Sequence, residues 1–431
     1  MVALGLLVVM SATAVARAAS PAIIVLTVKG VINPVMADYV ARGIEQAEET
    51  RASLCVIRLD TPGGLDTAMR DIVQSIVNAR VPVAVYVSPP GARAASAGVF
   101  VTVAAHVAAM APGTAIGAAS PVSIGSEGEV ELSETMQEKV LNDAAAYIRS
   151  LAQAHGRNVE WAERAVREAV SASEREALEL NVIDLVADSL DDLLAALNGY
   201  EVTLLDGPAV TIRTEGAFVR NIEMSWVEKF LLAITDPNIA FVLMGLATLG
   251  LWVEISNPGL IFPGVAGGIC LILALYALGN LPVNIAGVLL VVGAFGLFLA
   301  EIFTPTFGLL TGGGIIALTL GSLILFKGGP LFQVNPWVIA TLVIVVAAVM
   351  VLVIRKVVAV HRRQPATGRE GMVGERAVVK TALAPRGTVL VEGELWDAVS
   401  TSGEVAAGEE VMIERVDGMT LYVKPAAGRT P

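Results

Sequence analysis

The amino-acid sequence predicts a chain of three parts: an α/β domain, an α-helical membrane region and a small all-β domain. In the first half, short β-branched apolar runs alternate with amphipathic helical patterns, which is typical of parallel βαβ units. From residue 239 to residue 354 the only charged residues are Glu254, Glu301 and Lys327. After residue 370, short alternating strands are separated by glycine-containing turns.

Composition narrows the classes of function. The chain has 431 residues, of which 55% are hydrophobic and 16% charged, so it is too apolar for a purely soluble protein. Its net charge of −12 gives no support for nucleic-acid binding. The two cysteines, Cys55 and Cys270, lie in apolar runs of different regions. Neither a disulfide framework, a metal site nor a cofactor is therefore expected.

The first 19 residues resemble a targeting segment. An apolar run is followed by Ala16-Arg17-Ala18, which fits the small-residue cleavage pattern of a secretory signal. The segment is either a cleaved signal peptide or an N-terminal anchor. In both cases the domain that follows is exported.

Residues 20–220 are predicted to form the α/β domain. The expected strands are Ala22–Val28, Leu54–Leu59 and Val83–Val87, and the expected helices are Val35–Glu49, Leu65–Ala79 and Leu132–His155, followed by two shorter amphipathic helices. Residues 201–224 are polar and contain glycine, which favours a linker. Residues 221–237 include an amphipathic segment, Ser225–Ile234, that is expected at the membrane interface.

The membrane region, residues 238–355, is predicted to cross the bilayer about five times. The expected spans are residues 239–253, 260–279, 282–300, 307–326 and 336–354. An exported first domain and five spans place the C-terminus in the cytoplasm. A basic cluster between Arg355 and Arg363 follows the last span, as the positive-inside rule expects. The sequence thus predicts an integral protein of the cell membrane.

A weak repeat occurs within the membrane region. "EISNPGLIFPGVAGGI" begins at Glu254 and "EIFTPTFGLLTGGGI" begins at Glu301. One interpretation is a duplicated hairpin with a glutamate at the interface. The other is a pair of carboxylates that contact a partner or a lumen, because acids within membranes are often functional.

A basic and polar linker, residues 356–369, precedes a β domain at residues 370–431. Five short strands of this size are typical of an OB-like barrel. From Ala366 onward there are ten acidic against seven basic residues. Because OB surfaces that bind oligonucleotides need a basic groove, an interaction module is expected here.

Ser96 lies in "PPGARAASAGVF", directly after an apolar strand. This stretch is either a close-packed turn into a helix or a turn that presents a nucleophile, and a nucleophilic serine needs a base. His106 is expected to be structural, at the start of the next strand, and His155 to cap a helix at the surface. The remaining bases of the exported domain are Lys29 and Lys139.

Lys139 lies on the long predicted helix, on one side with Met136, Val140 and Asp143. It is either a solvated charge or the base of a Ser-Lys dyad. A dyad needs a neutral amine, which burial favours because it lowers the pKa of a lysine. The residues around Ser96 are suitably apolar.

Pro62-Gly63-Gly64 follows the second strand in "RLDTPGGLDTAMRDIV". Glycines allow close backbone approach and present N–H groups at a helix start, as an oxyanion hole requires. The alternative is an ordinary strand-to-helix turn. No phosphate-binding motif surrounds the glycine pair.

Three stretches in this order, "LDTPGG", "AASAG" and "EKVLNDAAAYIRSLAQAHGRNVEWAE", resemble the membrane-bound serine proteases of the NfeD family. The resemblance extends over nearly the whole chain, including "GTVLVEGELWDAVS" near the C-terminus. It implies a ClpP/crotonase-like fold for the first domain. The serine motif departs from the G-x-S-x-G elbow because Ala94 stands at its first position.

The resemblance also implies the roles of individual residues. Those expected at the site are the nucleophile Ser96, the general base Lys139 and the oxyanion-hole amides of Gly63, Gly64 and Ala97. Beside these motifs, Leu65, Ala95 and Val99 are our own candidates for contact with the substrate. The family is associated with stomatin-like membrane partners. A stomatin-like protein, membrane lipid and further copies of the chain are therefore the expected partners.

These observations favour a membrane-bound serine endopeptidase that cleaves apolar segments of membrane-associated proteins. A second hypothesis is a non-catalytic scaffold that organises a stomatin-like protein through the membrane and OB-like domains. An acyl-CoA enzyme on the same fold is weaker, because an exported location offers little CoA and no basic cluster is present for its phosphates.

Overall fold

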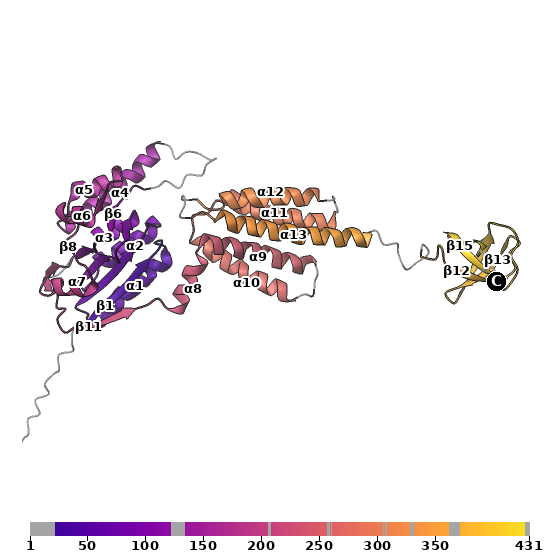
Figure 1. Ribbon diagram of the computed structural model, residues 1–431, viewed down its shortest axis with the longest axis horizontal. Coiled ribbons are helices and arrows are strands. Elements are labelled where there is room, and N and C mark those ends of the chain that lie inside the picture. The colour runs from indigo at the N-terminus through magenta and orange to yellow at the C-terminus, as the bar shows by residue number, and fades with distance from the viewer. Residues whose placement is uncertain are drawn as a thin grey trace, which may run out of the picture. The chain divides into compact units, whose positions relative to one another are not determined.

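The computed structural model describes residues 22–121, 134–205, 208–256, 259, 261–304, 306, 308–327, 332–361 and 371–426. The three predicted parts are present as an α/β domain, a set of long apolar helices and a small β-barrel (Figure 1). The expected signal segment, residues 1–19, lies outside the described residues.

The α/β domain is built on a six-stranded parallel sheet with the order β11-β1-β2-β3-β5-β8. The strands are β1 (Ala22–Lys29), β2 (Leu54–Asp60), β3 (Val83–Val87), β5 (Val107–Met110), β8 (Leu185–Val186) and β11 (Phe218–Ile222). The three strands expected from their apolar runs are confirmed. Such continuous runs are characteristic of central parallel strands, because both faces of the sheet are covered.

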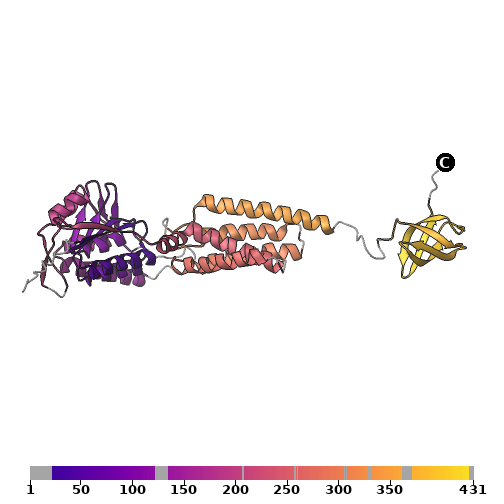
Figure 2. The same cartoon turned by 90° about the horizontal axis from the view of Figure 1, so that it is seen from below.

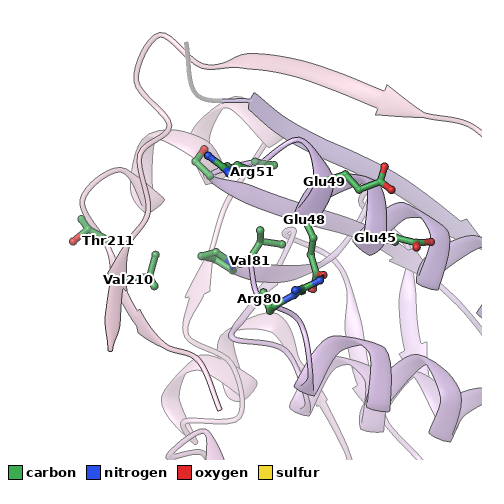
Figure 3. A pocket seen from close by; sticks show the side chains of 11 residues that line it. Glu45, Glu48, Glu49, Arg51, Arg80, Val81, Val210 and Thr211 are labelled. Carbon is green, nitrogen blue, oxygen red and sulfur yellow. Dashed lines mark hydrogen bonds and ion pairs between the residues drawn. The ribbon is translucent and has the colours of Figure 1, made fainter. Parts of the chain in front are cut away.

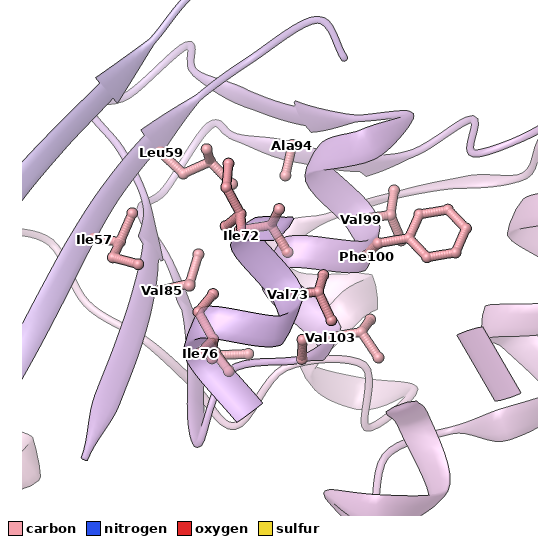
Figure 4. Close-up of a cluster of buried hydrophobic side chains, with 14 of the residues drawn as sticks. Ile57, Leu59, Ile72, Val73, Ile76, Val85, Ala94, Val99, Phe100 and Val103 are labelled. Atoms are coloured by element: carbon pink, nitrogen blue, oxygen red, sulfur yellow. The ribbon is translucent and has the colours of Figure 1, made fainter. Parts of the chain in front are cut away.

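Helices cover both faces of this sheet. On one side, α1 (Pro34–Glu49), α2 (Asp66–Val77) and α3 (Ala97–Val103) enclose the main core, where Ile57 and Val85 meet Ile72 and Val73 (Figure 4). On the other side, α7 (Leu190–Leu197) packs against the sheet through Leu193. The remaining helices are α4 (Glu134–Ala154), α5 (Val159–Arg167) and α6 (Glu174–Glu179).

A small second sheet shapes the turn that holds Ser96. It has the order β4-β6-β7, with β4 at Arg93–Ala95, β6 at Ala115–Gly117 and β7 at Ser171–Ser173. Strand β4 lies between β3 and α3 in the chain. Its pairing with β6 fixes the backbone that enters the Ser96 turn.

The expected linker at residues 201–224 is wrong. This segment contains β9 (Glu201–Thr203), β10 (Ala209–Thr211) and β11, and β11 pairs in parallel with β1. Because β11 is an edge strand, most of its side chains are exposed and its sequence "FVRNI" is nearly as polar as a linker. The sheet therefore extends beyond residue 220.

Helix α8 (Trp226–Ile234) follows β11 and is fixed against α1. Ser225 and Glu228 form a capping box at its start. Glu228 also pairs with Arg42 of α1 at 2.7 Å. The side-chain amide of Asn33 donates to the Thr235 hydroxyl at 3.0 Å, so both ends of α8 are tied to α1.

Five apolar helices follow: α9 (Pro237–Ser256), α10 (Ile261–Gly279), α11 (Ile285–Phe303), α12 (Leu309–Ile324) and α13 (Pro336–His361). Within the described residues, α9, α10 and α11 are long and apolar enough to cross a membrane, and α12 and Pro336–Leu352 are shorter apolar stretches. The count of five spans stays a prediction. Helices α9 and α10 touch through Gly250 and Gly267, where a Cβ on Gly250 would lie 2.8 Å from the Gly267 Cα.

The C-terminal part is a closed five-stranded barrel with the order β12-β13-β14-β16-β15 (Figure 2). Its strands are β12 (Arg376–Thr381), β13 (Arg386–Val391), β14 (Glu394–Ser400), β15 (Glu410–Asp417) and β16 (Thr420–Pro425). Alternating side chains such as Val389, Leu421 and Val423 fill its interior. The OB-like barrel expected from the sequence is confirmed.

A buried ion pair lies near the amino ends of β3 and β5. Arg157 is 5% exposed and pairs with Asp184 at 2.7 Å. Its guanidinium also donates to the carbonyl oxygens of Val103 and Ala105 at 2.6 and 2.8 Å. These contacts compensate for the burial of the charge.

Two histidines lie beside this ion pair. His106 Nδ1 accepts a hydrogen bond from the Val83 N–H at 3.1 Å, and the His155 ring meets it edge-on with centroids 5.8 Å apart. Burial, aided by the positive charge of Arg157, lowers the pKa of each histidine to about 4. His106 is structural, as expected, whereas His155 is partly buried rather than a surface cap.

We expect the free energy of unfolding to fall as the pH drops from 6.5, the ordinary histidine pKa, to about 4. In this window His106 and His155 are protonated in the unfolded chain but neutral in the folded one. Their contribution to the free energy of unfolding is therefore fully present above pH 6.5 and is lost as the pH falls to about 4. Each histidine accounts for at most about 3 kcal/mol. Denaturant unfolding of the full chain across this range checks the slope. The His155→Gln variant should flatten it and His361→Gln should not; equal slopes would contradict the assignment.

Candidate active site

Ser96 occupies a strained turn between β4 and α3, beyond the carboxyl end of β3. Its backbone has φ 53° and ψ −115°, a conformation that side-chain-bearing residues rarely adopt. Its N–H donates to the Gly117 carbonyl at 3.1 Å, and its carbonyl accepts from the Val99 N–H at 3.0 Å. The turn is therefore strained although Ala94 replaces the first glycine of the elbow motif.

The glycine pair lies against this serine. Gly63 has φ +121°, and a Cβ there would lie 2.7 Å from the Ser96 Cβ. A Cβ on Gly64 would lie 2.0 Å from the carbonyl oxygen of Ile32. Both positions therefore need glycine for space, and Gly63 needs it for its backbone conformation as well.

The three amides expected at an oxyanion hole differ in availability. The Gly63 N–H donates to the Thr61 hydroxyl at 3.0 Å. Within the described part of the chain, the N–H groups of Gly64 and Ala97 have no acceptor. Ala97 opens α3, so its N–H lies at the positive end of that helix. Of the three expected amides, those of Gly64 and Ala97 are thus the ones that remain available as donors.

One cleft of about 680 Å³ is lined by Ser96, the glycine pair and Ala97. Lys139 and Val140 of α4 line the same cleft, as do the expected substrate-contacting residues Leu65 and Ala95. Val99 does not, because its side chain is fully buried in the core beneath α3. Phe100, the next residue of that helix, lines the cleft instead.

Lys139 is exposed and forms no ion pair with any described residue. The other charged residues of the cleft are Asp66, Arg70 and Asp143, which pair with one another. Among the described residues, no group of three or more His, Cys, Asp or Glu side chains could hold a metal ion. The cleft brings together the Ser96 hydroxyl, the Lys139 amine and the backbone amides of Gly64 and Ala97.

Thr61 also belongs to the site, although it was not predicted from the sequence. It is fully buried, and its hydroxyl accepts from the Gly63 N–H and donates to the Gly63 carbonyl. A Cβ on Gly98 would lie 2.6 Å from its methyl group. The only available signal was its place in "LDTPGG" between a strand end and the glycine pair.

A second hollow, of about 550 Å³, lies at the amino ends of the strands (Figure 3). It includes Ser53 and Pro82, which precede β2 and β3, and an ion pair between Glu48 and Arg80. Ligands of parallel α/β sheets bind outside the carboxyl ends of the strands. This hollow lies at the amino ends, so it is the weaker candidate.

The two glutamates of the repeat lie at apolar hairpins. Glu301 is 2% exposed and accepts hydrogen bonds from the backbone N–H groups of Thr306, Gly308 and Thr311 at 2.9 to 3.1 Å. It thus caps the start of α12. Glu254 lies against α10, at a spot where Gly264 leaves room for its carboxylate. The interpretation as a structural hairpin glutamate is therefore favoured for Glu301.

We expect Gly63→Ala to abolish the reaction of Ser96 with a serine-reactive phosphonate, because the new methyl group would overlap the serine Cβ. Gly113→Ala is the matched control. Its φ is also positive, at +71°, but a Cβ there meets nothing within 4 Å. The control should therefore lose about 1–2 kcal/mol of stability through its backbone conformation and keep its labelling. Equal labelling of the two variants would contradict this packing.

The chain matches three family domains in order. Residues 22–200 match the NfeD1b N-terminal domain, residues 238–356 the NfeD integral membrane domain, and residues 369–425 the NfeD-like C-terminal, partner-binding domain.

Relatives match along nearly the whole length. The chain is 39% identical over 411 residues to the membrane-bound protease PH1510 of Pyrococcus horikoshii, covering 93% of this chain and 92% of the relative. It is 27% identical over 431 residues to the membrane protein NfeD1b of Bacillus subtilis, covering 95% and 94%.

Among solved structures, a variant of the membrane-bound stomatin-specific protease 1510-N of Pyrococcus horikoshii, in complex with a substrate peptide, is 39% identical. It covers 51% of this chain and 99% of its own, with a TM-score of 0.47. With three domains matched in order and a relative of 39% identity matched over 92% of its length, the chain belongs to the NfeD family and is an integral membrane protein.

Proposed function

We propose that this protein is a membrane-bound serine endopeptidase that uses a dyad of Ser96 and Lys139. One observation carries the proposal: a single cleft holds a serine on a strained turn, two backbone amides without acceptors among the described residues, and a lysine without an ion-pair partner among them. These are the nucleophile, the oxyanion donors and the base that acyl transfer needs. The relative named as a membrane-bound protease supports the same class.

In the proposed reaction, the neutral amine of Lys139 takes the Ser96 proton while the serine oxygen attacks a peptide carbonyl carbon. The N–H groups of Gly64 and Ala97 donate to the oxyanion that forms. The lysine then returns the proton to the leaving amine. Water, deprotonated in turn by Lys139, hydrolyses the acyl-enzyme and regenerates the serine.

The substrate we propose is an apolar segment of a membrane-associated, stomatin-like protein. Leu65, Met69, Phe100 and Val140 line the cleft and offer an apolar surface. Because Lys139 is exposed, an apolar segment that fills the cleft would remove water from its amine and favour the neutral form. The name of 1510-N, a stomatin-specific protease, supports the choice of partner.

We expect Ser96→Ala and Lys139→Ala each to lower cleavage of an apolar peptide by at least about 10³-fold, since the members of a catalytic unit fail together. Peptide cleavage by the full chain in detergent, alongside phosphonate labelling, measures this loss. Ser120→Ala is the matched serine control, because Ser120 lines the same cleft but donates to the Val166 carbonyl. Lys29→Ala is the lysine control.

The alternative is a non-catalytic scaffold for the same partner. The C-terminal family domain, described as partner-binding, favours a docking role for the barrel. A scaffold predicts that the partner is retained equally by wild type and Ser96→Ala and that no cleavage product appears with either. Phosphonate labelling of Ser96→Ala at the wild-type level would refute the proposed nucleophile.

We also propose that the α/β domain lies outside the cytoplasm and the barrel inside it, because a basic cluster follows the last apolar helix. Asp191→Cys on α7 and Ser402→Cys in the barrel place thiols at exposed positions. In intact cells a membrane-impermeant maleimide should label the first and leave the second unlabelled until lysis. The reverse pattern would overturn this orientation.

A further inference from the structure

Arg70 of α2 joins the helix that follows the glycine pair to the helix that carries Lys139. Its guanidinium pairs with Asp66 on its own helix at 2.8 Å and with Asp143 of α4. It also lies over the Tyr147 ring of α4, 4.6 Å from the centroid. The charge-assisted hydrogen bond to Asp143 and the cation–π contact with Tyr147 hold α4 against α2, while the bond to Asp66 fixes the guanidinium on its own helix.

Asp143 stands one helical turn after Lys139, and both line the cleft. Side chains four residues apart on a helix are neighbours and pair when their charges are opposite. In the structure Arg70 holds the Asp143 carboxylate, and Lys139 is without an ion pair among the described residues. A carboxylate bound to Lys139 would keep its amine protonated and therefore unable to act as a base.

We propose that Arg70 is a positioning residue for Lys139. By occupying the Asp143 carboxylate it keeps that group from pairing with Lys139, which leaves the amine free to accept the Ser96 proton. This inference rests on the proposed function.

Few other charges face the lysine among the described residues. Helix α3 and residues 118–121, which also border the cleft, carry none. The charged or titratable groups described on these two helices include Asp66, Arg70 and Asp71 of α2 and Glu138, Asp143, Tyr147 and Arg149 of α4; of these, Asp66, Arg70 and Asp143 line the cleft. Loss of Arg70 would free the carboxylates of Asp66 and Asp143, of which Asp143 lies one turn from the lysine.

The test measures the lysine directly. Competitive labelling of the full chain with acetic anhydride, read by mass spectrometry at a series of pH values, gives the pH midpoint at which Lys139 becomes reactive. We expect Arg70→Gln to raise this midpoint by about one unit. Phosphonate labelling of Ser96 at neutral pH should fall about tenfold and recover at higher pH. Arg70→Gln combined with Asp143→Asn should return both readouts toward wild type.

Arg149→Gln is the matched control. It removes another ion pair of α4, between Arg149 and Glu163 at 3.0 Å, and should leave the midpoint unchanged. An unchanged midpoint in Arg70→Gln, or a loss at every pH that Asp143→Asn does not restore, would overturn the inference. If the wild type neither cleaves peptide nor reacts with the phosphonate, the proposed function fails, while the lysine midpoint still decides the role of Arg70.

Discussion

The candidate site depends on how closely the turn that carries Gly63 approaches the turn that carries Ser96, at the carboxyl ends of the strands. Backbone hydrogen bonds join them: the Thr61 N–H donates to the Arg93 carbonyl at 2.8 Å, and the Ala95 N–H donates to the Thr61 carbonyl at 3.1 Å. At this spacing no side chain fits at Gly63. The position of Ser96 relative to the Gly64 and Ala97 amides follows from the same approach.

The surrounding core maintains the strained backbone. A residue in such a conformation costs about 1–3 kcal/mol and persists only where its neighbours over-determine it. All seven residues of α3 are buried, and β4 is paired with β6 on the other side of the serine. The turn is thus held from both ends by packing and by hydrogen bonds. A serine hydroxyl presented in this way is already placed before a substrate arrives, which is how binding sites reduce the entropic cost of reaction.

Charge is used differently in the two halves of the chain. In the cleft, the acidic side chains are occupied by Arg70, which leaves an amine without a counter-ion among the described residues. In the apolar helices, Glu301 is satisfied by backbone N–H groups at the start of the next helix. A buried carboxylate needs such donors because no water is available to replace them. The first arrangement leaves the Lys139 amine without an ion pair among the described residues, whereas the second closes a hairpin.

The sequence by itself determined the three parts of the chain, the central strands, the apolar helices and the barrel, because each rests on a local periodicity or on composition. It also brought forward Ser96, Gly63, Gly64 and Lys139 through short motifs and a family resemblance. The edge strand β11 was not predicted from the sequence, because a strand exposed along most of its length resembles a linker.

Only the tertiary structure decided which side chains share the cleft. Phe100 lines it and Val99 does not, because the rotation of α3 on the sheet turns Val99 into the core. The Gly63 amide is engaged by Thr61, and Asp143 by Arg70. These are contacts between residues brought together by folding, and no local pattern encodes them.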